Sequence, residues 1–98
     1  MGNKYESLAK PQATLDYHGR VWRSESEIKG ALDRFILECR SKGFLKVLVV
    51  TGKGLHSENG AVVKPIVLGY LKSRDDIKSV VDAPENQGGA GALMVTFW

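Results

Sequence analysis

An aspartate and a histidine stand two positions apart in the segment TLDYHG, residues 14–19. If this segment is a strand, Asp16 and His18 lie on the same face, about 7 Å apart along it. A histidine is a general acid or base near neutral pH, and a neighbouring carboxylate could orient it or act on its own. The alternative is that His18 caps the strand end and hydrogen-bonds its own loop.

A second candidate is the glycine-containing segment TGKGLHSENG, residues 51–60. Gly52 and Gly54 would let the backbone approach a ligand closely, and the helix expected next would offer free N–H groups to an anion. Three side chains add donors: Lys53, His56 and Ser57. The spacing matches neither the Walker A loop nor the dinucleotide-binding fingerprint. The alternative is an ordinary turn from strand to helix.

Four basic residues are expected just after or near the same edge: Arg20, Arg23, Lys53 and Lys64. Such clusters bind phosphate backbones, although a solvated charged rim is the common alternative. The net charge of +3, from 14 basic and 11 acidic residues, permits a nucleic-acid partner without requiring one. Trp22 could stack on a base, but covering the start of the following helix is the simpler interpretation.

The composition argues against a built-in metal site. The chain has a single cysteine and two histidines, so a cysteine-based zinc site and an intrachain disulfide are excluded. We expect no required cofactor. Asp16 could hold a transient Mg²⁺, because such ions need few protein carboxylates.

The clearest predicted element is a helix that starts after Ser24. Ser24 as N-cap and Glu27 three residues later form the capping-box pattern. Apolar side chains then recur at helical spacing and predict one buried stripe: Ile28, Ala31, Leu32, Phe35, Ile36 and Cys39. Gly43 should end the helix. Cys39 is therefore expected to be a core residue and not a nucleophile.

The remaining pattern predicts the order βαβαββ. Strands are expected over about 14–18, 47–50, 77–82 and 92–98, and a second helix starts near Asn59 or Gly60 with Pro65 about its first turn. Strands joined by helices should run parallel, and the last two should form an antiparallel hairpin. We expect a two-layer α/β sandwich with two helices on one face of a four-stranded mixed sheet.

This topology would bring three loops together. The ends of the first and second strands, and the glycine loop 88–91 after the third, should all lie at the carboxyl edge of the sheet. Ligands of open α/β sheets bind at that edge. The topology therefore favours a binding or catalytic surface there.

Length and composition set the remaining expectations. The 98 residues fit one domain, which we divide into a loosely ordered arm over 1–13 and a folded domain over 14–98. No apolar run is long enough to span a membrane, and the first residues lack the apolar stretch of a secretory signal. With its single cysteine, the chain is expected to be cytoplasmic.

Three segments together resemble the Smr (small MutS-related) domain family. They are LDYHG, VVTGKGLHSENG and GGAGALMV, in this order, and the resemblance covers about residues 14–97. Each motif is weak alone, but the combination is specific. This chain has Thr51 at a position where bacterial members often have histidine.

The resemblance implies a fold like the C-terminal domain of translation initiation factor 3. It also implies nucleic-acid binding, with endonuclease activity on DNA or RNA in several members. Carried over by position, Asp16 and His18 would be catalytic. The phosphate-facing surface would comprise Thr51, Gly52, Lys53, Gly54, His56, Gly89 and Gly91.

Three hypotheses about function follow. The first is a phosphodiester-cleaving domain in which Lys53 and Arg20 neutralise charge. On RNA the 2′-OH could attack without a metal, whereas on DNA a water must attack, which favours a metal ion. The alternative is a non-catalytic module that binds nucleic acid or the ribosome. The third is a protein-interaction domain that never meets nucleic acid.

Overall fold

A computed structural model describes residues 10–52 and 60–98 of the chain. The elements within these ranges, in chain order, are β1 (Thr14–Asp16), α2 (Glu25–Ser41), β2 (Lys46–Val50), α3 (Gly60–Lys72), β3 (Ile77–Asp82), the 3₁₀ turns η1 (Glu85–Gln87) and η2 (Gly89–Gly91), and β4 (Ala92–Phe97). The predicted order βαβαββ is confirmed. The predicted first strand was two residues too long.

Helix α2 begins where the capping pattern predicted. The Ser24 hydroxyl accepts a hydrogen bond from the Glu27 backbone N–H at 3.1 Å. The Glu27 carboxylate in turn accepts from the Arg23 N–H at 3.0 Å, one residue before the cap. Gly43, with φ of 76°, follows the last residues of the helix, as expected for a left-handed stop signal.

Helix α3 differs from expectation at its proline. The helix starts at Gly60, so Pro65 is inside it and beyond the first turn. Proline has no N–H to donate to the carbonyl four residues earlier, so the helix carries one backbone bond fewer there. The helix continues because Val63, Val67 and Leu71 bury one face of it in the core.

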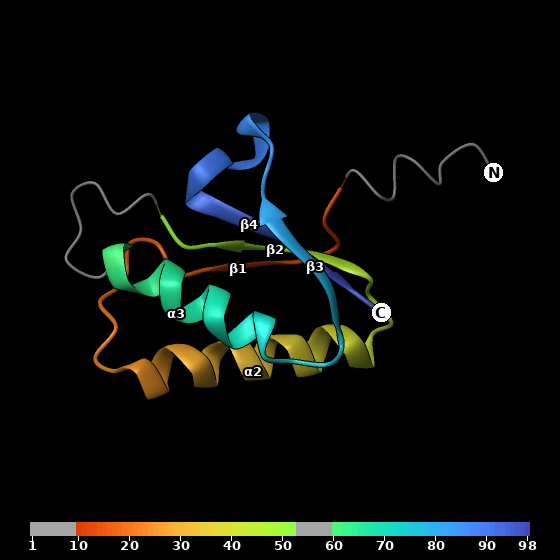
Figure 1. Ribbon diagram of the computed structural model, residues 1–98, viewed down its shortest axis with the longest axis horizontal. Coiled ribbons are helices and arrows are strands. Elements are labelled where there is room, and N and C mark those ends of the chain that lie inside the picture. The colour runs from red at the N-terminus through yellow and green to blue at the C-terminus, as the bar shows by residue number, and fades with distance from the viewer. Residues whose placement is uncertain (1–9, 53–59) are drawn as a thin grey trace.

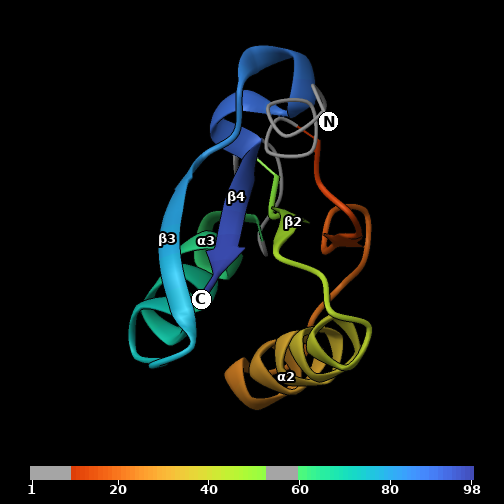
Figure 2. The same ribbon diagram turned by 90° about the vertical axis from the view of Figure 1, so that its right-hand side faces the viewer.

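The sheet has the strand order β1-β2-β4-β3 (Figures 1 and 2). β1 and β2 are parallel, and β4 runs antiparallel to both of its neighbours, β2 and β3. β4 is thus inserted between two strands that run parallel to each other. The carboxyl ends of β1, β2 and β3 therefore point the same way, as the sequence predicted.

Both helices lie on the same side of the sheet (Figure 1), which gives the predicted two layers. Val47 and Val49 of β2 face the helices and belong to the main core. Leu48, between them in sequence, faces the other way and joins Met94 in a smaller cluster. The central strand is therefore apolar on both faces, which explains its unbroken run of valine and leucine.

The hydrogen bonds along this edge of β2 extend to Gln12, which precedes β1 in the sequence. The Gln12 N–H donates to the Lys46 carbonyl at 2.8 Å, and the Gln12 side-chain oxygen accepts from the Leu45 N–H at 2.6 Å. The division into an arm and a domain at residue 13 stays a prediction, because residues 1–9 lie outside the described ranges.

Among the described residues, no helix is both long and apolar enough to cross a membrane.

Candidate functional site

The end of β1 is shaped by the carboxylate of Asp16. Its Oδ1 accepts a hydrogen bond from the backbone N–H of His18 at 2.8 Å, which bends the chain into a turn. Gly19, with φ of 85°, completes the change of direction. Asp16 and His18 are both exposed, whereas Tyr17 between them is buried. The predicted alternation of faces is confirmed, and Asp16 bonds to the backbone of His18.

The end of β2 is tied to the loop before β4. The backbone N–H groups of Thr51 and Gly52 both donate to the carbonyl oxygen of Gly91, each at 2.9 Å. The buried Thr51 hydroxyl donates to the Gly52 carbonyl at 3.2 Å. These two amides are therefore used inside the protein and cannot also hold a phosphate. The predicted binding residues Lys53, Gly54, His56 and Ser57 lie outside the described ranges.

The imidazole of His18 lies against Gly52. A Cβ atom placed on Gly52 would stand only 3.2 Å from His18 Cδ2. The φ of Gly52, 81°, is also in the region that favours glycine. The first two candidate segments, predicted separately from the sequence, are thus in direct contact at the carboxyl edge of the sheet.

The third segment shapes this edge from within. Gly89 and Gly91 of η2 are buried, so they cannot form an exposed surface themselves. A Cβ atom on Gly89 would stand 2.9 Å from the Glu85 carboxylate. Any role of these glycines toward a phosphate would therefore be indirect, through the placement of Thr51 and Gly52.

Lys64 of α3 reaches across to the same loop. Its ammonium donates to the Ala90 carbonyl at 2.9 Å and to the Asp82 carboxylate at 3.2 Å. An ammonium has three N–H donors, and within residues 10–52 and 60–98 these two contacts use two of them. Lys64 links the helix to the third loop while part of its charge is balanced by Asp82.

Arg20 and Trp22 form the wall beside the β1 end. Trp22 is buried, and its indole N–H donates to the Tyr17 carbonyl at 3.1 Å. The rings of Tyr17 and Trp22 are 4.7 Å apart at their centroids. The guanidinium of Arg20 lies over the Trp22 ring, 4.2 Å from its centroid. Trp22 is thus part of the core, and Arg20 covers one face of its ring, on which a base would otherwise stack.

The sequence interpretation missed the part played by Tyr17. Its hydroxyl donates to the Ile28 carbonyl at 2.7 Å inside the core, which fastens the site strand to α2. Burial raises the pKa of this hydroxyl well above its ordinary value, against the opposing effect of the Arg34 charge. The position of Tyr17 between Asp16 and His18, two polar residues, was the feature of the sequence that could have indicated its burial. Burial likewise raises the pKa of the Cys39 thiol, in line with its expected core role.

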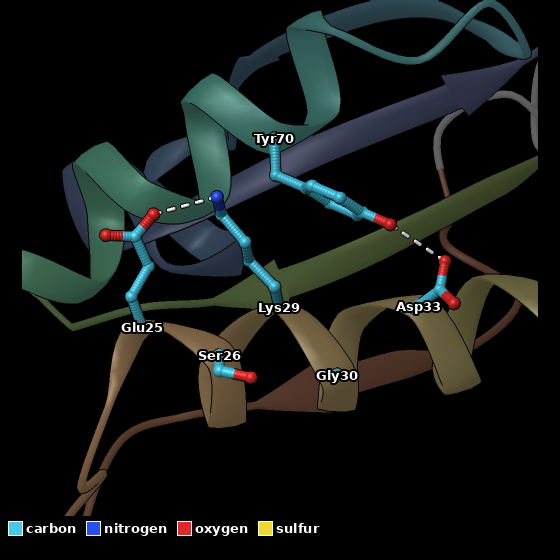
Figure 3. A pocket seen from close by; sticks show the side chains of 6 residues that line it. All are labelled: Glu25, Ser26, Lys29, Gly30, Asp33 and Tyr70. Atoms are coloured by element: carbon cyan, nitrogen blue, oxygen red, sulfur yellow. Dashed lines mark hydrogen bonds and ion pairs between the residues drawn. The ribbon is translucent and has the colours of Figure 1, made fainter.

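A groove of about 450 Å³ lies between α2 and α3 (Figure 3). Its charged and polar groups pair with one another: Lys29 with Glu25 at 2.7 Å, and the Tyr70 hydroxyl with Asp33 at 2.8 Å. The hydrogen bonds from Tyr70 and then Arg74 lower the pKa of the Asp33 carboxyl. The Tyr70–Asp33 bond joins α3 to α2, whereas the Lys29–Glu25 pair lies within α2.

Within residues 10–52 and 60–98, no cluster of three or more histidine, cysteine, aspartate or glutamate side chains could hold a metal ion. Asp16 nevertheless presents an exposed carboxylate at the sheet edge. A transient Mg²⁺ at Asp16 stays a prediction, because such an ion keeps most of its water ligands.

Comparison with known proteins gives the family. The Smr domain model matches residues 15–97. An uncharacterized protein of Treponema pallidum is 35% identical over 94 residues, which are 96% of this chain and 45% of that protein. Endonuclease MutS2 of Streptococcus pneumoniae is 34% identical over 87 residues, 89% of this chain and 10% of that protein. This chain therefore spans less than half of either relative.

A solved structure supports the fold. The crystal structure of YdaL, a stand-alone small MutS-related protein from Escherichia coli, superposes with a TM-score of 0.76 at 27% identity. The match covers 89% of this chain and 66% of that one. The predicted family resemblance and the predicted fold class are both confirmed.

Proposed function

Because this chain belongs to the Smr domain family, we propose that it binds nucleic acid at the carboxyl edge of its sheet and cleaves phosphodiester bonds there. The observation that carries the proposal is the contact of His18 with Gly52, which is itself hydrogen-bonded to Gly91. A side chain that can transfer protons thus lies against a glycine of the second segment at the carboxyl edge of the sheet. The MutS2 relative is named an endonuclease, which supports the proposed cleavage of phosphodiester bonds.

On RNA, the proposed reaction starts with attack of a 2′-OH on the adjacent phosphorus. The bond from phosphorus to the 5′-oxygen breaks, which leaves a 2′,3′-cyclic phosphate and a 5′-OH. One proton leaves the 2′-OH and one must reach the 5′-oxygen, and His18 is the exposed group suited to such transfer near neutral pH. Asp16 would fix the backbone at His18 through the hydrogen bond that its carboxylate accepts from the His18 N–H.

Positive charge near the phosphorus would stabilise the transition state. Arg20 is exposed and lies beside the β1 end, and Lys64 uses two of its three donors on Asp82 and Ala90 within the described residues. Lys53, His56 and Ser57, together with Arg23, complete the proposed binding set by sequence position. On DNA the attacking group would be water, which Mg²⁺ bound by Asp16 would help to activate.

One observation favours the alternative, a non-catalytic module that binds nucleic acid or the ribosome. The Asp16 carboxylate already accepts the His18 N–H at 2.8 Å. Such a bond gives the aspartate a structural reason to be present without any substrate. The alternative keeps the same surface but assigns Asp16 to the turn alone.

The test compares wild type with Asp16→Ala, Asp16→Asn and His18→Ala on a labelled structured RNA and on supercoiled plasmid, with and without EDTA. Asparagine keeps an oxygen that can accept the His18 N–H but lacks the charge. We expect cleavage by wild type and its loss in both Asp16 variants and in His18→Ala. The EDTA lane then separates attack by a 2′-OH from metal-assisted hydrolysis.

The other outcomes decide between the proposals. Retention of cleavage by Asp16→Asn, with loss in Asp16→Ala, would restrict Asp16 to shaping the turn. Salt-sensitive binding by wild type without cleavage would support the non-catalytic module. Equal cleavage by all four proteins would indicate a contaminating nuclease and remove the catalytic assignment.

A further inference from the structure

The loop between β1 and α2 carries an ordered stack of three side chains. The Tyr17 ring contacts the Trp22 ring at 4.7 Å between centroids, and Arg20 lies over Trp22 at 4.2 Å. Tyr17 and Trp22 are buried at 2% and 7% exposure, whereas Arg20 is exposed. The stack therefore runs from the core outward and ends in a cation at the surface.

We propose that Trp22 is a positioning residue that holds the Arg20 guanidinium ready for one phosphate of the bound nucleic acid. The inference rests on the proposed function and deepens it, because it assigns a specific contact and the side chain that prepares it. Arg20 touches the substrate, and Trp22 acts only through Arg20.

The geometry of arginine makes the two contacts compatible. A guanidinium uses its flat face to stack on an aromatic ring, while its N–H donors lie around its edge. Stacking on Trp22 thus leaves the edge open for two parallel hydrogen bonds to a phosphate. A long side chain normally loses rotamer freedom when it binds, and a side chain already held on a ring loses less.

The place of the stack links it to the catalytic pair. The Trp22 indole N–H donates to the carbonyl of Tyr17, the residue between Asp16 and His18. The Trp22 side chain therefore bonds to the backbone at the end of β1 and also supports the guanidinium of Arg20, two residues before it in sequence. A phosphate held by Arg20 would have its place set relative to His18 by this single side chain.

The test measures the affinity of a labelled RNA hairpin and a labelled DNA duplex between about 50 and 200 mM salt. Arg20→Gln should weaken binding about tenfold at the lower salt concentration and reduce the salt slope by about 0.7 to 0.9. Arg20→Lys should restore only part of the affinity, because lysine keeps the charge without the flat fork. Lys42→Gln removes the same charge beyond the far end of α2 and is the matched control.

Variants of Trp22 separate the ring from its N–H group. Trp22→Phe keeps an aromatic face and should keep the affinity and the salt slope, whereas Trp22→Leu should lower the affinity by less than Arg20→Gln does, because the Arg20 charge remains. The double variant of Trp22→Leu with Arg20→Gln should bind no more weakly than Arg20→Gln alone, because Trp22 acts only through Arg20. Additive losses would overturn the inference.

Fluorescence gives a readout that does not depend on Trp22→Leu folding. The chain has two tryptophans, so Trp98→Phe leaves Trp22 as the reporter, and Trp98 itself is exposed. Nucleic-acid binding should change the Trp22 emission, and Arg20→Gln should abolish that change. An unaltered response in Arg20→Gln would overturn the inference.

The proposed function can fail separately. If wild type shows no salt-dependent binding to either probe, the proposed function falls and this inference falls with it. If wild type binds and Arg20→Gln keeps the full affinity and salt slope, the proposed function stands and only the inference is overturned.

Discussion

The imidazole of His18 rests on the Cα side of Gly52, where a methyl group would stand 3.2 Å from its Cδ2 atom. Two segments more than thirty residues apart in sequence thus meet through the absence of a side chain. The His18 ring leaves no free space for a side chain at residue 52, so its position is sensitive to the smallest substitution there.

Gly52→Ala should disturb the site more than the fold. Alanine at φ of 81° costs about 1–2 kcal/mol, and its methyl group would push the His18 ring away. We expect a matching loss in the free energy of unfolding, measured by urea denaturation, and a larger fractional loss of cleavage. Gly69→Ala is the control, because its Cβ meets no atom within 4 Å in α3 and should stabilise the protein by about 1 kcal/mol. Unchanged cleavage in Gly52→Ala would contradict this view of the contact.

Lys64→Met should loosen the loop that carries Gly91. The substitution removes the bond to the Ala90 carbonyl and the ion pair with the exposed Asp82 carboxylate. The amides of Thr51 and Gly52, which donate to Gly91, should then exchange with solvent faster, as measured by amide hydrogen exchange. Asp82→Asn keeps the Ala90 contact and should have a clearly smaller effect. Equal acceleration by both variants would assign the effect to the ion pair.

Asp76→Asn should change how stability depends on pH. Two hydrogen bonds from Arg74, both 2.9 Å, lower the pKa of the Asp76 carboxyl. A lowered pKa in the folded state stabilises the protein above the unfolded value, about 4, and this contribution is lost as pH falls through the folded value. We expect Asp76→Asn to cost about 1–3 kcal/mol at neutral pH and progressively less below about pH 4.

Urea unfolding at several pH values checks the Asp76 prediction. Asp33→Asn is a useful comparison, because Asp33 contacts Tyr70 and Arg74 of the same network but is more exposed. Asp33→Asn should also lower the free energy of unfolding at neutral pH and progressively less at acidic pH, but by a smaller amount than Asp76→Asn. A cost of Asp76→Asn that stays constant down to strongly acidic pH would show that the carboxylate charge is not the source of the stability.

Much of the fold follows from local pattern. Helical spacing correctly selected Ile28, Leu32, Ile36 and Cys39 as the buried face of α2, because period and capping are properties of neighbouring residues. The order of strands and helices predicted that three loops share one edge, which the bonds to Gly91 and the contact of His18 with Gly52 confirm. These features depend on chain direction and periodicity, both readable from the sequence.

The details of the site depend on tertiary placement instead. The sequence could not show that the N–H groups of Thr51 and Gly52 are used by the Gly91 carbonyl, which removes them as anion donors. It also left open whether Trp22 faces a base or the core, and the structure shows Arg20 over its ring. Such outcomes are set by side chains that meet only after the sheet has formed.

The position of β4 has a consequence for biosynthesis. β4 is the last strand of the sheet to leave the ribosome, yet it lies between β2 and β3. Until β4 has been synthesised, β2 and β3 lack the strand that pairs with both of them. The Gly91 carbonyl, just before β4, is then also not in place to accept from Thr51 and Gly52. We therefore expect the domain to complete its sheet only after translation of β4, so that the candidate site becomes competent late and all at once.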